Sequence, residues 1–347
     1  MKPLARLACA LAASLVTAMP AHAQDITALS QRTGPDRESK LLEAARKEGT
    51  VSVYTSLVSK DMGTLAAAFE KKYGVKVSYW RAGSEKVLQR AVTESRAGRH
   101  DVDVIETNGP ELEALAREKI LAPATTAHAK DLLPESIRPD RRWTGLRLNM
   151  FVQAYNTNLV KPQELPKAYH DLLDPKWKGR LAMEAEDVDW FAAVVTGMGE
   201  AQGVSFFRDL VSTNGVGLRK GHTLLAGLVA SGEVPFALTL YNHNAEKLKK
   251  EGAPIEWFQI QPAYARVNGI GVTARAPHPN AALLFFDYLL GPEGQAILQK
   301  AKYIPTNLTL KDPHTSASLR FIDPRIILDE QEKWNRLFDE IITRQAR

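Results

Sequence analysis

The sequence predicts an α/β fold of two lobes, and three observations support this prediction. The chain has 347 residues, enough for two domains that each bury a core. Short apolar strands alternate with helical segments, a pattern typical of parallel β-α-β crossovers. The pattern occurs before about residue 150, occurs again after it, and resumes after about residue 265. We therefore expect two crossings between the lobes, which together form a two-stranded hinge.

Three helix-strand units predict the first lobe. The expected strands are 51–55, 75–79 and 102–106, and the expected helices run from Asp36 to Gly49, from Ser59 to Gly74 and from Ser84 onward. Each helix carries apolar residues at helical spacing, and serine is a favoured N-cap residue. Lobe 1 is predicted to comprise residues 36–150 and 265–347.

The second lobe, residues 151–264, shows the same alternation. Its expected strands are 181–183 and 234–240, and its expected helices begin near Asp187, Gly203 and Thr223. After the return near 265, the sequence predicts strand 269–273 and helices 281–290 and 330–342. Hinge strands are expected near 152–155 and 264–269.

The N-terminus has the features of a secretory signal peptide. Lys2 and Arg6 precede an apolar run, and Ala21-His22-Ala23 provides the small residues that precede a cleavage site. We expect cleavage after Ala23, a periplasmic protein, and a flexible arm at 24–35. Cys9, the one cysteine of the sequence, lies within the signal and would be removed with it.

Composition argues against nucleic-acid binding and against a membrane-spanning protein. The 45 Lys and Arg residues oppose 40 Asp and Glu residues, and removal of Lys2 and Arg6 leaves 43 against 40, a net charge of +3. These charges are interspersed along the chain, not clustered as in a nucleic-acid-binding face. No stretch after the signal approaches the roughly 20 apolar residues of a spanning helix.

Small polar residues follow each of the first three strands. They are Thr55 and Ser56, Gly83 and Ser84, and Asn108. In open α/β sheets, ligands bind beyond the carboxyl ends of the strands, where helix N-termini offer free N–H groups. These residues are therefore candidate ligand-binding residues. For a single serine such as Ser59 or Ser84, helix capping alone is the simpler interpretation.

An acidic segment begins the first helix of the second lobe. It contains Glu184, Glu186, Asp187 and Asp189. One interpretation is ordinary capping by Asp187, because the helix dipole favours carboxylates there. The other is that a carboxylate faces the ligand, where it would repel phosphate and attract an ammonium group or a metal ion. Asp187 and Asp189 are thus candidate ligand-binding residues.

The second lobe has two further candidate segments. Arg219 to Thr223 is a basic, glycine-containing turn at a helix N-terminus, and 241–243 follows a strand. From them we select as ligand-binding residues His222, Thr223, Tyr241, Asn242 and His243. Asp187, His222, Tyr241 and His243 would make an alternative set for a divalent metal ion, although no close spacing supports it. No cofactor is expected.

Several motifs together resemble the periplasmic substrate-binding proteins of ABC importers, in particular the ferric-iron-binding group. These motifs are the segments 40–55, 68–77, 103–106, 171–180, 231–233 and 285–296. The resemblance implies a type II periplasmic binding protein fold, closure of two lobes around a small ligand, and a membrane permease with its ATPase as partner. It also implies a monomer.

At the positions of the iron ligands, this sequence differs from the ferric-iron-binding members of the family it resembles. They hold iron with two adjacent tyrosines, a carboxylate and often a histidine. The corresponding positions here are Asn242 and His243, Asn108 and Val58. Because Fe³⁺ needs anionic oxygen ligands, we expect an organic or zwitterionic solute held between an acidic wall and a basic wall. Transport of ferric or divalent metal ions is the alternative.

An enzymatic function has little support in the sequence. It contains no G-x-S-x-G, H-E-x-x-H, P-loop or complete dinucleotide-binding motif. We therefore predict that the protein is not an enzyme. A secreted hydrolase and a chemosensory adaptor are the alternatives of another class.

Overall fold

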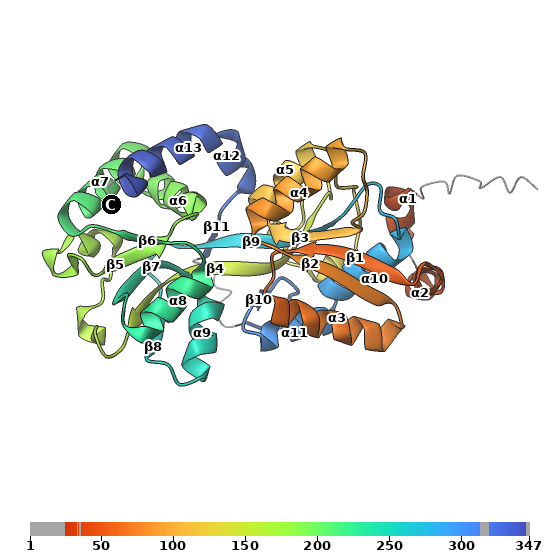
Figure 1. The fold of residues 1–347 in the computed structure, drawn as a ribbon, viewed down its shortest axis with the longest axis horizontal. Helices are drawn as coiled ribbons and strands as arrows, with labels where there is room; N and C mark the ends of the chain where they lie inside the picture. The colour runs from red at the N-terminus through yellow and green to blue at the C-terminus, as the bar shows by residue number, and fades with distance from the viewer. Residues whose placement is uncertain (1–24, 33, 35, 313–318, 345–347) are drawn as a thin grey trace, which may run out of the picture.

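Two lobes lie on either side of a pair of long strands in the computed structural model (Figure 1). The structure describes residues 25–32, 34, 36–312 and 319–344. The predicted signal peptide and its cleavage site lie outside the described residues. The sheet runs from one lobe through the hinge into the other. Its strands follow one another in the order β2 (Lys76–Arg81), β1 (Thr50–Thr55), β3 (Val104–Asn108), β9 (Ala263–Val272), β4 (Thr144–Asn156), β7 (Phe236–Tyr241), β5 (Leu181–Glu184) and β6 (Gly217–Arg219).

Lobe 1 contains three parallel strands and the helices that cover them. The strands are β1 (Thr50–Thr55), β2 (Lys76–Arg81) and β3 (Val104–Asn108). The helices are α2 (Arg37–Glu48), α3 (Ser59–Tyr73), α4 (Ser84–Arg96), α5 (Gly109–Arg117), α10 (Pro279–Leu290) and α11 (Pro292–Lys300), with β10 (Ile304–Pro305) behind them. A helix follows each strand, as the sequence predicts for β1 and β2, whereas the helix α5 after β3 was not predicted.

Lobe 2 repeats this arrangement around its own core. Its strands are β5 (Leu181–Glu184), β6 (Gly217–Arg219), β7 (Phe236–Tyr241) and β8 (Ile255–Phe258). Its helices are α6 (Val188–Met198), α7 (Glu200–Asn214), α8 (His222–Ser231) and α9 (Asn242–Lys250). Aromatic residues fill its core, including the fully buried Trp177, Trp190 and Phe207. Trp190 is therefore a core residue and offers no face to a ligand.

The hinge consists of β4 (Thr144–Asn156) and β9 (Ala263–Val272), which pair antiparallel. Both strands are buried along their whole length. β4 also pairs with β7 of lobe 2, and β9 pairs with β3 of lobe 1. The two predicted hinge segments lie within these strands, and the two strands are longer than expected.

The two ends of the described chain differ from the expectations. Part of the predicted arm forms helix α1 (Ile26–Ser30), because Ile26 and Leu29 are buried against the core of lobe 1. The C-terminal segment contains β11 (Leu319–Phe321), α12 (Pro324–Asp329), α13 (Gln331–Phe338) and a final π-helical turn, Asp339–Thr343. Trp334 and Phe338 pack in the core of lobe 2, although the sequence assigns them to lobe 1. The exact lobe boundaries remain a prediction.

Two predicted helix caps are wrong. Val58 occupies the N-cap position of α3 and Gly83 that of α4, so Ser59 and Ser84 are the first helical residues and cap nothing. Asp187 does occupy the N-cap position of α6, but its side chain makes no capping hydrogen bond. Among the described residues, no helix combines the length and apolar character that a membrane crossing requires.

Candidate functional site

A cavity of about 900 Å³ lies between the lobes and is lined by residues of both lobes and of the hinge. Lobe 1 contributes residues 56–59, 83–85, Arg81, Asn108, Pro110, Glu111 and Tyr303; the hinge contributes Arg147, Asn149 and Arg266. Lobe 2 contributes residues 184–189 and 220–224, Tyr241, His243 and Asn244. Trp334 and its neighbours on α12 and α13 close one side.

Four polar residues lie together on the hinge strands, and three of them, Arg147, Asn149 and Arg266, line the cavity. In the β4–β9 register, Arg147 is opposite Asn268 and Asn149 is opposite Arg266. Directly opposite residues of an antiparallel pair project to the same face, and so do residues two apart. Buried polar groups are costly unless they are hydrogen-bonded. These four polar residues therefore stand out in two buried strands that are otherwise mainly apolar.

Arg266 organises the lobe 2 side of the cavity. Its Nε donates to Asp189 Oδ2 at 2.5 Å, a second hydrogen bond reaches Asp189 Oδ1, and Nη1 donates to the Tyr241 hydroxyl at 2.7 Å. Burial alone would lower the pKa of Arg266, but Asp189 and Tyr241 outweigh this effect and raise the pKa well above its ordinary value. The guanidinium is therefore a permanent, fully bonded cation.

Arg147 connects the hinge to side chains of lobe 1, as Arg266 connects it to lobe 2. Its Nη2 lies 3.1 Å from Glu106 Oε1, and Nη1 donates to Asn149 Oδ1. Glu106 Oε2 accepts hydrogen bonds from the hydroxyl of Thr55 at 2.6 Å and from the backbone N–H of Leu57 at 3.0 Å. Thr55 thus supports the loop before α3 from behind, as a buried residue, and does not line the cavity.

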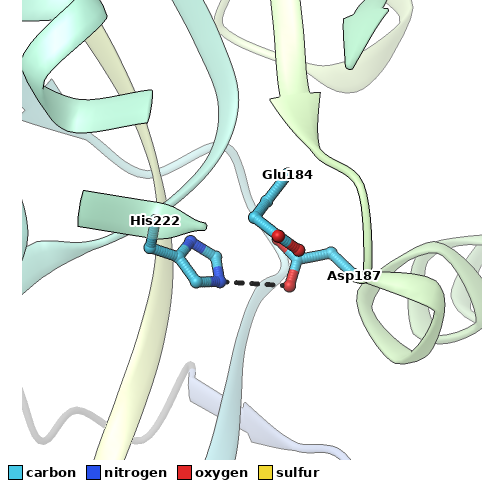
Figure 2. A group of neighbouring side chains, drawn as sticks. All are labelled: Glu184, Asp187 and His222. Carbon is cyan, nitrogen blue, oxygen red and sulfur yellow. Dashed lines mark ion pairs between the residues drawn. The ribbon is translucent and has the colours of Figure 1, made fainter. Parts of the chain in front are cut away.

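Two buried carboxylates and a histidine meet on the lobe 2 wall (Figure 2). His222 Nε2 lies 3.2 Å from Asp187 Oδ1. Burial raises the pKa of Glu184, and the neighbouring Asp187 carboxylate adds to the rise. Burial opposes ionisation of Asp187 as well, but its contacts with His222 and Arg266 outweigh burial and lower its pKa. Asp187 is therefore ionised within this pair.

A row of neighbouring rings leads from lobe 2 to lobe 1. The centroid of the Tyr241 ring lies 3.8 Å from that of His222, in a tilted arrangement, and 5.5 Å from that of His243, on which it stacks; His243 in turn lies 4.3 Å from Tyr303. Burial raises the pKa of the Tyr241 hydroxyl well above its usual range. Burial lowers the pKa of His243 well below its usual range, and the charge of Arg147 adds to this effect. The site thus contains a neutral phenol and a neutral imidazole.

The lobe 1 wall is made of helix N-termini and one cation without a carboxylate partner. The starts of α3, α4 and α5 line the cavity through Ser59, Ser84 and Glu111. Arg81 is exposed beside them; its Nε reaches the carbonyl oxygen of Leu57 at 3.4 Å, and no carboxylate of the described residues lies within 4.0 Å of it. This wall can therefore accept an anionic group.

Most of the predicted site residues line this cavity. They are Ser56, Gly83, Ser84, Asn108, Asp187, Asp189, His222, Thr223, Tyr241 and His243. Thr55 and Asn242 do not line it: both are buried, and the side-chain oxygen of Asn242 has no hydrogen-bond partner among the described residues. The binding role of the ten lining residues remains a prediction.

The alternative metal set is not brought together as predicted. Asp187 and His222 are neighbours, but the Tyr241 ring separates His222 from His243, and the Tyr241 hydroxyl is bonded to Arg266. Glu184 takes the place of these two residues beside Asp187 and His222.

The acidic and basic segments lie on one wall, contrary to the expectation of opposite walls. Lys220 Nζ lies 2.6 Å from Glu186, and the backbone N–H of Gly221 donates to Glu184 at 2.8 Å. The parallel pairing of β5 with β6 explains this, since adjacent parallel strands end at the same edge. The basic turn therefore neutralises part of the acidic segment, and the positive wall is instead that of Arg81.

The sequence prediction missed Arg81 on the lobe 1 wall, the two hinge arginines Arg147 and Arg266, and also Glu111 and Tyr303; all of them line the cavity. A signal for the two hinge arginines is present in the sequence, because each interrupts a strand of mainly apolar residues. A charged residue inside a buried strand needs a partner, which marks it as a site candidate. No comparable sequence pattern marks Tyr303 or Glu111.

A family model described as bacterial extracellular solute-binding protein matches residues 64–319. The chain belongs to this family. Family membership confirms the predicted class: the protein is a periplasmic or extracellular substrate-binding protein of an ABC importer, and it is not an enzyme. A permease partner and a small ligand follow from the same membership.

Among its relatives, this solute-binding protein is similar to proteins of iron uptake. It is 28% identical over 273 residues to the Fe(3+)-binding periplasmic protein of Serratia marcescens, covering 74% of this chain and 78% of that protein. It is 25% identical over 287 residues to iron uptake protein A1 of a Synechocystis strain, covering 78% and 79%. These names support the iron alternative better than the expected organic solute.

Solved structures confirm the predicted fold class. Iron-bound HitA of Pseudomonas aeruginosa superposes with a TM-score of 0.72 at 24% identity and covers 84% of this chain and 99% of that one. AfuA of Actinobacillus pleuropneumoniae with bound fructose-6-phosphate superposes at 0.73 and 20% identity, covering 85% and 99%. The solute-binding protein thus has a fold that occurs with different ligands.

Proposed function

We propose that this chain captures a small polar organic solute with an anionic group between its lobes and delivers it to a permease and its ATPase. The cavity volume is within the roughly 300–1,000 Å³ range of small-molecule sites. The proposal includes export with cleavage after Ala23 and action as a monomer. Binding from both walls would favour the closed state that the permease recognises.

The observation that carries this proposal is the position of Arg81. It lies beside the N-termini of α3 and α4 and has no carboxylate partner within 4.0 Å among the described residues. A guanidinium and helix N-terminal N–H groups both favour carboxylate and phosphate groups. The serine side chains of Ser56, Ser59 and Ser84 would add hydrogen bonds there, since none of them acts as a helix N-cap.

The lobe 2 wall would bind the other end of the solute. It carries Glu184, Glu186, Asp187 and Asp189 against Lys220 and Arg266, so carboxylates outnumber the permanent cations in contact with them. Hydroxyl groups of the solute, or a positive charge, would suit this wall. A zwitterionic solute would supply that positive charge itself.

Ferric iron is the second candidate, and the names of the relatives favour it. The chemistry of the side chains opposes it. The charge of Arg266 favours the phenolate of Tyr241, but burial and the neighbouring carboxylates outweigh it and raise the pKa of the hydroxyl, so the phenolate that Fe³⁺ requires is disfavoured. Asn242 is buried and does not line the cavity.

Native mass spectrometry and a thermal-shift screen of the exported protein distinguish these candidates. We expect one small organic anion or zwitterion to bind at one per chain and to raise the melting temperature in the presence of EDTA. Arg81→Gln should weaken that binding, whereas Arg99→Gln on the same lobe but outside the cavity should not. A strong visible tyrosinate band with ferric citrate, without any organic ligand, would instead establish iron transport. Turnover of the ligand would indicate a hydrolase.

A further inference from the structure

Glu184, Asp187 and His222 come from three different elements and point toward one another (Figure 2). Glu184 ends β5, Asp187 precedes α6, and His222 begins α8. One ligand atom from each lies within 4.8 Å of the others. Two ligands of one metal ion lie roughly 3 Å or more apart when each bond is about 2.0–2.2 Å. The 3.2 Å between His222 Nε2 and Asp187 Oδ1 fits this spacing.

Backbone hydrogen bonds fix the Glu184 carboxylate in place. Its Oε1 accepts from the N–H of Gly221 at 2.8 Å, and its Oε2 accepts from the N–H of Glu186 at 2.6 Å. A carboxylate has about four lone-pair positions, so both oxygens keep capacity for a cation. Such outer contacts orient ligands in metal sites.

Asp187 provides a second, independent observation. Its residue is 1% exposed, and its Oδ2 is buried without a hydrogen bond of normal geometry among the described residues. Its Oδ1 is shared between His222 at 3.2 Å and Arg266 at 3.4 Å. A buried carboxylate with an oxygen that lacks a well-formed hydrogen bond is costly unless a cation contacts it.

The charges of this wall leave room for a cation. Lys220 pairs with Glu186, and Arg266 makes its closest contacts with Asp189. Glu184 has no lysine or arginine within 4.0 Å among the described residues, and Asp187 has only the longer contact to Arg266. Two carboxylates, once a bound cation keeps both ionised, match the charge of a divalent ion.

We propose that Glu184, Asp187 and His222 bind one divalent transition-metal ion of the zinc type. One imidazole nitrogen and two carboxylate oxygens are ligands that Zn²⁺ accepts, whereas Fe³⁺ would need phenolate. All three residues line the cavity, so a fourth coordination position faces it. An anionic solute held by the opposite wall can occupy that position. Only this last step, in which the solute occupies the fourth coordination position, rests on the proposed function.

The test uses the tag-free mature protein, freed of metal by dialysis against EDTA. Calorimetric titration with ZnCl₂ is expected to give one site per chain, and Co²⁺ is expected to give visible d–d absorption at the same stoichiometry. His222→Gln and Glu184→Gln each remove one ligand and should weaken Zn²⁺ binding at least about 10–100-fold, the loss typical even for outer-shell changes. Glu184→Gln keeps an oxygen for a backbone N–H.

His170→Gln is the matched control, because His170 is exposed in lobe 2 and lies outside the cavity. It should bind Zn²⁺ as the unmodified protein does. Absence of a saturable site, or unchanged binding in both site variants with unchanged melting temperatures, would overturn the metal site. An organic ligand found in EDTA under those circumstances would leave the proposed function intact. Zinc binding without any organic ligand would refute the organic-solute proposal and support the metal site.

Discussion

The Arg266 guanidinium on β9 donates a hydrogen bond of 2.7 Å to the hydroxyl of Tyr241 at the end of β7. This contact joins the hinge to lobe 2 immediately before Asn242 and His243, the positions that the resemblance assigns to the tyrosine pair of ferric-iron-binding proteins. Burial raises the pKa of Tyr241 well above its usual range although the charge of Arg266 opposes this, and a buried neutral phenol is a poor ligand for Fe³⁺.

Replacing Arg266 with alanine is expected to destabilise the protein strongly. The change would leave the buried Asp189 without its main cation and the buried Asp187 without its arginine contact, and breaking a buried ion pair typically costs about 3–5 kcal/mol. Urea unfolding monitored by circular dichroism measures the loss. Lys47→Ala is the control, because its partner Glu43 is exposed and such pairs contribute under about 1 kcal/mol. A loss below about 1 kcal/mol for the Arg266 variant would contradict this prediction.

An ion pair between the lobes should contribute to ligand affinity without touching the ligand. Lys247 on α9 lies 2.7 Å from Asp61 on α3, and Tyr303 donates to the same carboxylate at 2.7 Å. Lys247→Met removes a partly exposed pair worth about 0.5–1 kcal/mol, so the apparent affinity should fall roughly two- to fivefold. Calorimetry with the solute identified by the screen measures it.

The effect of Lys247→Met should shrink at high salt, because salt screens exposed pairs. Lys47→Met within α2 is the control, and it should leave the affinity unchanged. Unchanged affinity in the Lys247 variant at low salt would show that this ion pair does not stabilise the closed state.

Gly203 on α7 is required for close helix packing. A Cβ added there would lie 2.5 Å from the Cα of Val195 on α6, and backbone cannot move aside easily. Gly203→Ala should therefore cost about 1–3 kcal/mol of unfolding free energy. Gly227→Ala on α8 has no atom within 4 Å of the new Cβ and should be neutral or stabilising by up to about 1 kcal/mol. Equal effects of the two changes would refute this packing argument.

Glu111 should make stability depend on pH. Burial raises the pKa of Glu111 to about 7, and its Oε2 has no hydrogen-bond partner among the described residues. The folded protein thus keeps a proton that the unfolded chain loses above about pH 4.5, so stability falls as pH rises from about 4.5 to 7. Each pH unit in that window costs at most about 1.4 kcal/mol.

Glu111→Gln removes this dependence, so its stability relative to the unmodified protein should increase from pH 5 to pH 7.5. Urea unfolding at several pH values measures the difference. Glu118→Gln is an exposed control and should show no trend. A relative stability of the Glu111 variant that falls with rising pH would show that the carboxyl group is ionised without cost.

Local sequence patterns were sufficient for the elements and for much of the cavity. The residues after the first three strands lie where predicted, because strand ends in a parallel sheet meet at one edge. The caps were wrong at Ser59 and Ser84, since the backbone of Val58 and Gly83 takes the cap position without a side-chain hydrogen bond. The burial of Ile26 was missed because its partners on α10 are distant in sequence.

The alternation of strands and helices, the absence of enzyme motifs and the family motifs determined the fold class and the transport role from sequence alone. Only the tertiary structure decided the polarity of the site. Arg266 and Asp189 are 77 positions apart, and the β4–β9 register together with the start of α6 brings them into contact. Charge neutralisation depends on distances between side chains, which local sequence patterns do not contain. For that reason the acidic and basic segments were predicted on opposite walls, although adjacent strand ends place them on one.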